Sequence, residues 1–245
     1  MIFMFRSVLM SIMTAMLLIG NVCFAAADTD TPKDDKNFLP THKHTANCEK
    51  TSAEPVQIIC ILDRSGSMYS LEKDVIGGYN AFLKKQRQES GKAEVTTVLF
   101  DDQYEKVADA VDLQAVNDIT AAEYFARGNT ALMDAIGRTI RETLAKMEND
   151  GVCPAKRRVL VLIMTDGLEN ASKEYNKAAV KSLIEATTKE YAWTYEFIGA
   201  NIDSAAEAKS IGIDASHSMN YDADSEGVQQ SFARMGEAAK AARSR

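Results

Sequence analysis

Residues 56–68 read VQIICILDRSGSM, an apolar run that ends in a short polar loop. The part from 56 to 62 is almost entirely aliphatic and partly β-branched, which is typical of a strand buried on both faces of a sheet. The run RVLVLIM at 158–164 has the same character. Two such strands predict a parallel sheet that helices cover on both sides.

The segments around these two runs alternate between helical and strand-like patterns. Apolar residues at helical spacing predict helices at 71–90, 132–147 and 177–191, a short helix from 203, and a last helix to 242. Shorter apolar runs predict strands at 93–100, after Asp102 through Val111, at 194–198 and at 218–221. Gly77 and Gly78 lie inside the first helix, where we expect them to allow close packing on the sheet.

This alternation predicts the α/β class, with a doubly wound, mostly parallel central sheet and helices on both faces. The strands on either side of Asp101 and Asp102 are expected to form an antiparallel hairpin at one edge. A length of 245 residues fits one folded domain with extensions, or two small domains, and a hydrophobic content of 46% excludes disorder throughout. The net charge of −7, without a dense basic stretch, argues against nucleic acid as a partner.

The first 27 residues differ in composition from the rest of the chain. Arg6 is their one charged residue, and an apolar run from Val8 to Ile19 precedes the alanines at 25–27. This pattern predicts a signal peptide, 1–27, because the run is short for a membrane span and Ala-x-Ala suits cleavage. We expect an exported protein, periplasmic or secreted, without a stable membrane span after cleavage. Two alternatives stay open: an uncleaved membrane anchor, and a cytoplasmic protein if the start codon is mis-assigned.

Residues 28–54 are rich in charge and threonine and nearly lack apolar side chains. Such a segment cannot bury enough surface to fold alone, so we predict a flexible tether, followed by one folded domain at 55–245. His42, His44 and Cys48 within it are residue types that bind zinc or copper. Three such side chains on a flexible segment have no fixed geometry, and we favour solvated side chains over a metal site.

Ligands of open α/β sheets bind where loops leave the carboxyl ends of the central strands. The first buried strand leads into Asp63-Arg64-Ser65-Gly66-Ser67, and the second leads into Thr165-Asp166-Gly167. A further loop, Arg127-Gly128-Asn129-Thr130, opens the helix at 132–147. The sequence therefore predicts a site that combines aspartates and hydroxyl side chains from several loops.

These motifs carry a family resemblance. Asp63-x-Ser65-x-Ser67, then Thr130 within Gly-x-Thr-x-Leu-x-Asp, then Asp166-Gly167, resemble the von Willebrand factor A (VWA) domain family with a complete metal-ion-dependent adhesion site (MIDAS). The resemblance covers about residues 55–242, the whole predicted folded part. It implies a bound metal and the following metal residues: Asp63, Ser65, Ser67, Thr130 and Asp166.

A hard divalent cation prefers oxygen ligands, and we expect magnesium, with manganese or calcium as alternatives. Ser65 and Ser67 are expected to direct both hydroxyls at one ion from an extended turn, with Gly66 allowing the bend. The resemblance implies that Asp63 and Asp166 act mainly through water or hydrogen bonds. It also implies an open coordination position, so the expected partner is a protein that presents an Asp or Glu.

Other residues of these loops are expected to support the metal residues or to form a rim that selects the partner: Gly66, Gly128, Asp134, Gly167 and Glu169, with Asn170, Asp101, Asp102, Asn201 and Asp203 as further rim candidates. Asp134, one helical turn beyond Thr130, is expected to support the loop that carries Thr130. Solvated loop side chains are the simpler interpretation for most of the rim.

The predicted mature chain contains an odd number of cysteines. Cys60 lies in the middle of a buried strand and is expected to be an inert core residue. Cys48 and Cys153 precede the two central strands, which are parallel neighbours in the fold that the resemblance implies. We therefore expect a Cys48–Cys153 disulfide at the edge opposite the metal, in an oxidising compartment.

An enzyme is not predicted. The sequence lacks a Gly-x-Ser-x-Gly elbow, a phosphate-binding glycine-rich loop with lysine, and a dinucleotide-binding fingerprint. The expected function is metal-dependent binding of a protein partner. One alternative is a scaffold or assembly subunit whose metal is only structural. The other is a phosphatase-type enzyme that would use Asp63, although Ser65 stands where that motif has a second aspartate.

Overall fold

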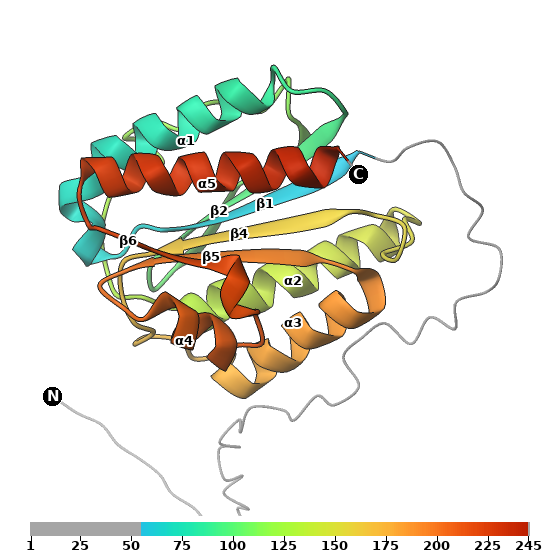
Figure 1. Ribbon diagram of the computed structural model, residues 1–245. Helices are drawn as coiled ribbons and strands as arrows, with labels where there is room; N and C mark the ends of the chain where they lie inside the picture. Colours follow the sequence, from blue (N-terminus) through green and yellow to red (C-terminus); the bar gives the residue numbers. More distant parts are fainter. Residues whose placement is uncertain (1–54, 245) are drawn as a thin grey trace, which may run out of the picture. The chain divides into compact units, whose positions relative to one another are not determined.

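The computed structural model describes residues 55–244, which lie within one compact unit. A central sheet is covered by helices on both faces (Figure 1). The strands are β1 (Val56–Asp63), β2 (Ala93–Phe100), β3 (Tyr104–Asp112), β4 (Val159–Thr165), β5 (Thr194–Ala200) and β6 (Ser218–Tyr221). The helices are α1 (Glu72–Gln86), α2 (Leu132–Asn149), α3 (Lys177–Tyr191), α4 (Ser204–Ser210) and α5 (Ser225–Arg243), with short 3₁₀ helices at Gly66–Leu71 and Ala215–His217.

The sheet has the strand order β3-β2-β1-β4-β5-β6. Every neighbouring pair is parallel except β2 and β3, which form an antiparallel hairpin at one edge. β1 lies inside the sheet, where Ile59 pairs with Thr96 of β2 and with Val161 of β4. The predicted α/β class, with a mostly parallel sheet and one antiparallel edge strand, is confirmed.

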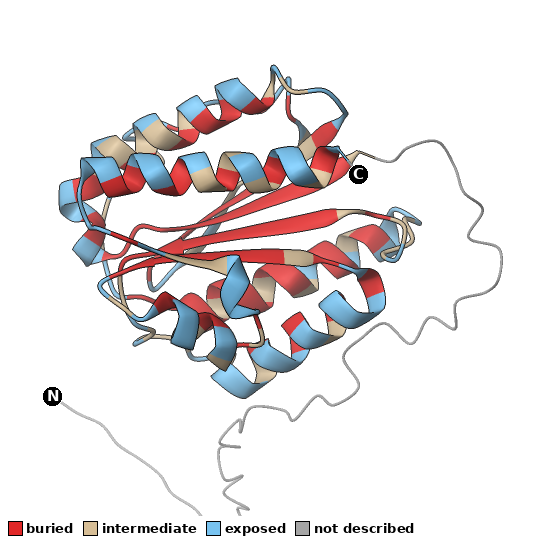
Figure 2. Ribbon diagram, in the orientation of Figure 1, coloured by how far each residue is buried: buried red, intermediate tan, exposed pale blue. Residues whose placement is uncertain are grey.

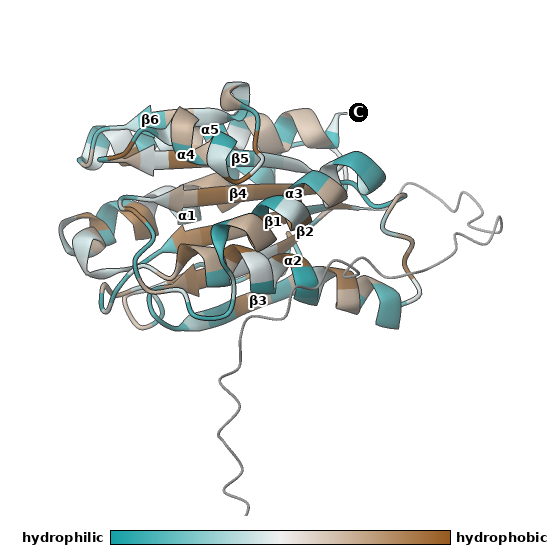
Figure 3. Cartoon of the chain, turned by 90° about the horizontal axis from the view of Figure 1, so that it is seen from below, coloured by the Kyte–Doolittle hydropathy of each residue, from teal (hydrophilic) through white to brown (hydrophobic). Residues whose placement is uncertain are grey.

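Side chains of β1 alternate between two apolar cores, one on each face of the sheet. Ile58, Cys60 and Leu62 belong to the core that α1 and α5 cover, and Ile59 and Ile61 belong to the core that α2 and α3 cover. All of these residues are fully buried, and the strands are coloured mostly as buried in Figure 2. Because both faces are covered, β1 is apolar at every position from Ile58 to Leu62, and the central strands form the apolar layer seen in Figure 3.

The helix predicted at 71–90 is shorter in the structure. α1 ends at Gln86, and a 3₁₀ helix at Gly66–Leu71 precedes it. A Cβ at Gly78 would lie 2.3 Å from Cδ2 of Phe232 in α5, whereas a Cβ at Gly77 would meet nothing within 4 Å. The expectation that this pair packs on the sheet is therefore wrong. Gly78 instead allows α1 to approach α5, the helix beside it in Figure 1.

Several predictions fall on residues outside the described part of the chain. These are the signal peptide at 1–27, the tether at 28–54, and the side chains of His42, His44 and Cys48. Cys153 has a free thiol and is partly exposed, so its disulfide with Cys48 stays a prediction. Between residues 55 and 244, no helix is both long and apolar enough to cross a membrane.

Candidate metal centre

The predicted site loops meet at one edge of the sheet. β1 and β4 are parallel neighbours, so Asp63 at the end of β1 and Thr165 at the end of β4 lie at the same edge. The loop at 127–130 joins them there, because the backbone N–H of Gly66 donates a hydrogen bond of 3.2 Å to the carbonyl oxygen of Gly128. Pieces that are far apart in the sequence thus form one surface.

The hydroxyl and carboxylate side chains of these loops form a connected group. The Oγ atoms of Ser65 and Ser67 are 3.1 Å apart, and the Ser67 hydroxyl donates a hydrogen bond of 2.5 Å to Oδ1 of Asp166. A Cβ at Gly167 would lie 3.8 Å from Thr130 Oγ1 and 3.9 Å from Ser67 Oγ. The Thr130 and Ser67 hydroxyls therefore lie within 4 Å of the same point beside Gly167.

Asp63 is 1% exposed and completes the centre from the interior. Its Oδ1 accepts a hydrogen bond of 2.7 Å from the Ser65 backbone N–H, and its Oδ2 accepts one of 2.6 Å from the Thr165 hydroxyl. Burial, assisted by the charge of Asp166, raises the pKa of Asp63 to about 6, although these hydrogen bonds act in the opposite direction. Burial also raises the pKa of Asp166.

The donor set fits a hard divalent cation. Ser65, Ser67 and Thr130 offer neutral hydroxyls, while Asp63 and Asp166 supply negative charge, and such cations prefer oxygen ligands. Within residues 55–244, neither aspartate has an ion-pair partner, so a bound cation would relieve the cost of burying their charges. The same residues contain no group of three or more His, Cys, Asp or Glu placed to hold a metal.

Two glycines allow the loops to approach each other. Gly128 has a φ of +62°, and a Cβ there would lie 2.3 Å from Oδ1 of Asp102, so the position favours glycine. A Cβ at Gly66 would lie 3.3 Å from the Gly128 carbonyl oxygen. The extended turn expected for both serines is wrong for Ser67, because Ser67 belongs to the 3₁₀ helix that follows Ser65. That helix turns the two hydroxyls toward each other.

Asp134 and Glu169 connect α2 to the loop that follows β4. The Asp134 carboxylate accepts hydrogen bonds of 2.8 to 2.9 Å from the backbone N–H groups of residues 173–175. The Glu169 carboxylate accepts a hydrogen bond of 2.8 Å from the backbone N–H of Met133 and one of 2.7 Å from the hydroxyl of Ser172. Asp134 thus supports the loop after β4, and Glu169, expected either to support the metal residues or to form the rim, joins that loop to the start of α2.

Arg64 and Asp101 form a buried ion pair that the sequence motifs did not indicate. Arg64 Nε lies 3.2 Å from Asp101 Oδ2, and both side chains are fully buried. Asp101 Oδ2 also accepts a hydrogen bond of 2.6 Å from Arg127 Nε. Arg64 Nη2 lies 2.7 Å from Glu105 Oε2. The rim position expected for Asp101 is therefore wrong, because its carboxylate ties the β2–β3 turn to the other two loops.

Sequence reasoning also missed two side chains that contact Asp63. Thr165 holds its carboxylate, and the Tyr124 hydroxyl donates a hydrogen bond of 2.5 Å to its carbonyl oxygen. Thr165 directly precedes Asp166 at a strand end, and this position could have indicated its contact with the centre. Tyr124 is brought to the centre only by the fold.

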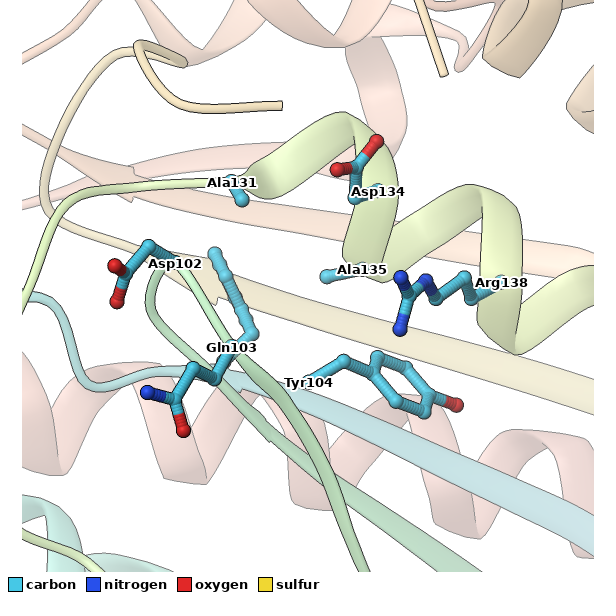
Figure 4. A pocket seen from close by; sticks show the side chains of 8 residues that line it. Asp102, Gln103, Tyr104, Ala131, Asp134, Ala135 and Arg138 are labelled. Atoms are coloured by element: carbon cyan, nitrogen blue, oxygen red, sulfur yellow. The ribbon is translucent and has the colours of Figure 1, made fainter. Parts of the chain in front are cut away.

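The remaining rim candidates differ in role. Asn170 Oδ1 accepts a hydrogen bond of 2.9 Å from the Thr130 backbone N–H, and Asp203 caps α4. Asp102 and Asn201 are exposed. A cavity of about 290 Å³ opens beside Ala131, between the β2–β3 turn and the start of α2 (Figure 4). Its lining residues are Phe100, Asp102, Gln103, Tyr104, Ala131, Asp134, Ala135 and Arg138.

Structures that share this fold include metal-bound proteins. The manganese-loaded TRAP protein of Plasmodium vivax has a TM-score of 0.53 at 20% identity, over 76% of this chain and 75% of that chain. The mussel byssus protein PTMP1, solved with a zinc-occupied MIDAS motif, has a TM-score of 0.54 at 14% identity, over 76% of this chain and 48% of that chain.

A von Willebrand factor type A protein from Catenulispora acidiphila has a TM-score of 0.53 at 20% identity, over 78% of this chain and 43% of that chain. The chain spans about half the length of this protein and of PTMP1. At these identities the likeness concerns the fold.

The sequence itself identifies the family. No curated protein sequence matches the chain. The family model described as VWA domain containing CoxE-like protein matches residues 38–193. This range is more than half of the chain, begins within the predicted tether and includes all the loops of the centre. The chain therefore belongs to the family of VWA domain containing CoxE-like proteins.

Proposed function

We propose that this chain binds a protein partner through a divalent metal, with one coordination position open for a carboxylate of the partner. The observation that carries this proposal is the hydrogen-bonded line from Ser65 through Ser67 to Asp166, with the Thr130 hydroxyl beside it. The manganese in the Plasmodium protein and the zinc in the mussel protein support a divalent cation at this position. We propose magnesium as the physiological ion.

The residues of this chain would hold the ion and leave it reactive toward a ligand. Ser65, Ser67 and Thr130 would bind it directly, and Asp63 and Asp166 would balance its charge through hydrogen bonds. A cation held mainly by neutral hydroxyls keeps its attraction for a further carboxylate. Ser67 is exposed, which supports access of a partner from solvent.

We propose no catalytic role for the centre. His217, the histidine within residues 55–244, lies 2.8 Å from Glu196 of β5, next to the edge strand β6. No imidazole therefore contacts the hydroxyls of the centre in the described part of the chain to act as a general base.

Thermal unfolding with increasing magnesium, manganese or calcium tests the metal. An ion that binds only the native state raises stability by about 2.7 kcal/mol when its free concentration is a hundredfold above the dissociation constant. We expect the unfolding temperature of the chain to rise with metal concentration until it saturates. The unfolding temperatures of Thr130→Ala and Ser67→Ala should show no such rise. Ser182→Ala, on the exposed side of α3, is the matched control and should keep the rise. A chain without any saturable rise contradicts the proposal.

Water-proton relaxation with bound manganese tests the open position. N-acetylglutamate methylamide should displace metal-bound water and lower the relaxation enhancement, whereas the corresponding glutamine compound should not. Free manganese with the same compounds is the control. If the metal binds but the two compounds act alike, the metal is only structural, and the chain is better described as a scaffold or assembly subunit.

Export is a separate part of the proposal, supported by the apolar run Val8–Ile19 and the alanines before Asp28. N-terminal sequencing of the chain from its native host should give Asp28 as the first residue. A chain that retains residues 1–27 would instead support an anchored or a cytoplasmic protein.

A further inference from the structure

Large apolar side chains are exposed in or next to the loops that form the candidate metal centre. Within residues 55–244 they are Tyr69, which is 75% exposed, Leu168, which is 62% exposed, and Phe125, which is 38% exposed. Each lies within two residues of a different loop of the centre. Tyr69 follows Ser67 in the 3₁₀ helix, and Leu168 follows Gly167. We call these three side chains the apolar collar.

Phe125 is held in place by charged neighbours. Its ring centroid lies 5.5 Å from Cζ of Arg64 and 5.0 Å from Cζ of Arg127. Arg64 is fully buried, and both arginines bond Asp101, so the ring rests on a fixed support. Tyr69 and Leu168, by contrast, leave more than half of their surface to solvent. The fold therefore presents apolar surface at the centre that its own packing does not cover.

We propose that the collar binds apolar side chains that flank the metal-binding carboxylate of a protein partner, an inference that rests on the proposed function above. Apolar area that leaves water on binding contributes about 25 cal/mol per Å², and such residues at the middle of an interface dominate affinity. A carboxylate alone would bind the metal and leave the collar in water. The partner is thus expected to present an Asp or Glu between exposed apolar residues.

Charge and composition favour this occupant over two others. The chain carries a net charge of −7, which opposes binding to an anionic lipid surface. A second copy would have to present an acidic residue with exposed apolar neighbours. Within residues 55–244, the large exposed apolar side chains all belong to the collar, so no other described face of a second copy meets this requirement.

A displayed library of short peptides with one fixed glutamate tests the proposal on the full chain in magnesium. We expect enriched peptides to carry large aliphatic or aromatic residues next to the glutamate, and a chelator should abolish their binding. A synthetic enriched peptide should bind Leu168→Ser and Tyr69→Ser about tenfold more weakly than the parent chain. Lys189→Ser, an exposed residue near the end of α3, is the control and should bind normally.

The outcomes separate the collar from the metal site. Metal-dependent binding of peptides with polar residues beside the glutamate, or equal affinity for Leu168→Ser, would overturn the collar and leave the proposed function intact. If the chain binds no peptide in a metal-dependent manner, both proposals fail. A magnesium-dependent dimer that Leu168→Ser abolishes would assign the collar to a second copy. The thermal response to magnesium should be unchanged in both collar variants, because neither side chain holds the ion.

Discussion

The guanidinium of Arg64 and the carboxylate of Asp101 form an ion pair with both side chains fully buried, Nε to Oδ2 at 3.2 Å. The backbone N–H of Asp101 donates a hydrogen bond to the carbonyl oxygen of Gln103. The carbonyl oxygen of Asp101 accepts one from the backbone N–H of Ala131. The pair therefore joins the loop of the serines, the β2–β3 turn and the segment after Thr130.

Asp101→Asn should strongly destabilise the chain, because Arg64 loses the carboxylate that faces it in the interior. Removing one partner of a buried pair costs about 3 to 5 kcal/mol, and Glu105 should reduce this toward the lower end. Urea unfolding measures the change. Asp118→Asn is the matched control, since its pair with Arg87 is exposed and should cost less than about 1 kcal/mol. Equal effects of the two variants would contradict this role of Asp101.

The stability of the metal-free chain should fall as pH rises, through Asp63. Burial raises the pKa of Asp63 from 3.8 to about 6. The folded chain thus keeps this proton at pH values where the unfolded chain has lost it. The contribution is fully present below about pH 4 and is lost as pH rises through about 6, a change of up to ~3 kcal/mol.

Comparison with Asp63→Asn isolates most of this effect, because the carboxyl groups other than the neighbouring Asp166 titrate alike in both chains. In the presence of a chelator, the free energy of unfolding of the parent chain should decrease relative to Asp63→Asn between about pH 4 and about pH 7. Magnesium at neutral pH should restore the free energy of unfolding of the parent chain and leave that of the variant unchanged. A difference between the two chains that does not vary with pH would show that Asp63 titrates normally.

Glu169→Gln should loosen the contact between the loop after β4 and the start of α2. The carboxylate bonds the Met133 backbone N–H at 2.8 Å and the Ser172 backbone N–H at 2.7 Å, and hydrogen bonds to a charged group contribute about 1.5 to 3 kcal/mol. We expect a loss of about 2 kcal/mol in the free energy of unfolding and weaker magnesium binding. Glu174→Gln, which breaks the surface pair with Arg138, is the control and should leave magnesium binding unchanged.

The two described cysteines should differ in reactivity. Burial raises the pKa of the Cys60 thiol to about 12, so Cys60 should resist alkylation by iodoacetamide at about pH 8 until the chain unfolds. Cys153 is partly exposed, and if it pairs with Cys48 in the exported chain, it should be alkylated only after reduction. Mass spectrometry of the labelled peptides measures both. Full labelling of Cys153 without a reductant would contradict the disulfide.

Sequence alone determined the sheet and the residue types of the candidate centre. The apolar runs of β1 and β4 are continuous because both faces of these strands are covered, and this pattern is local in the sequence. The residue types of the Asp63–Ser67 motif and of Asp166 are equally local, since each follows directly from a strand end. The strand predictions and the composition of the site therefore needed no knowledge of distant contacts.

Tertiary structure decided which side chains hold the centre together and which remain free. Asp101 and Glu169 have the residue types of rim residues, but one is paired with Arg64 and the other with the start of α2. Conversely, Tyr69 and Leu168 have the residue types of core residues and lie in solvent. Burial and pairing depend on contacts between loops that are far apart in the chain, and sequence spacing carries no information on those contacts.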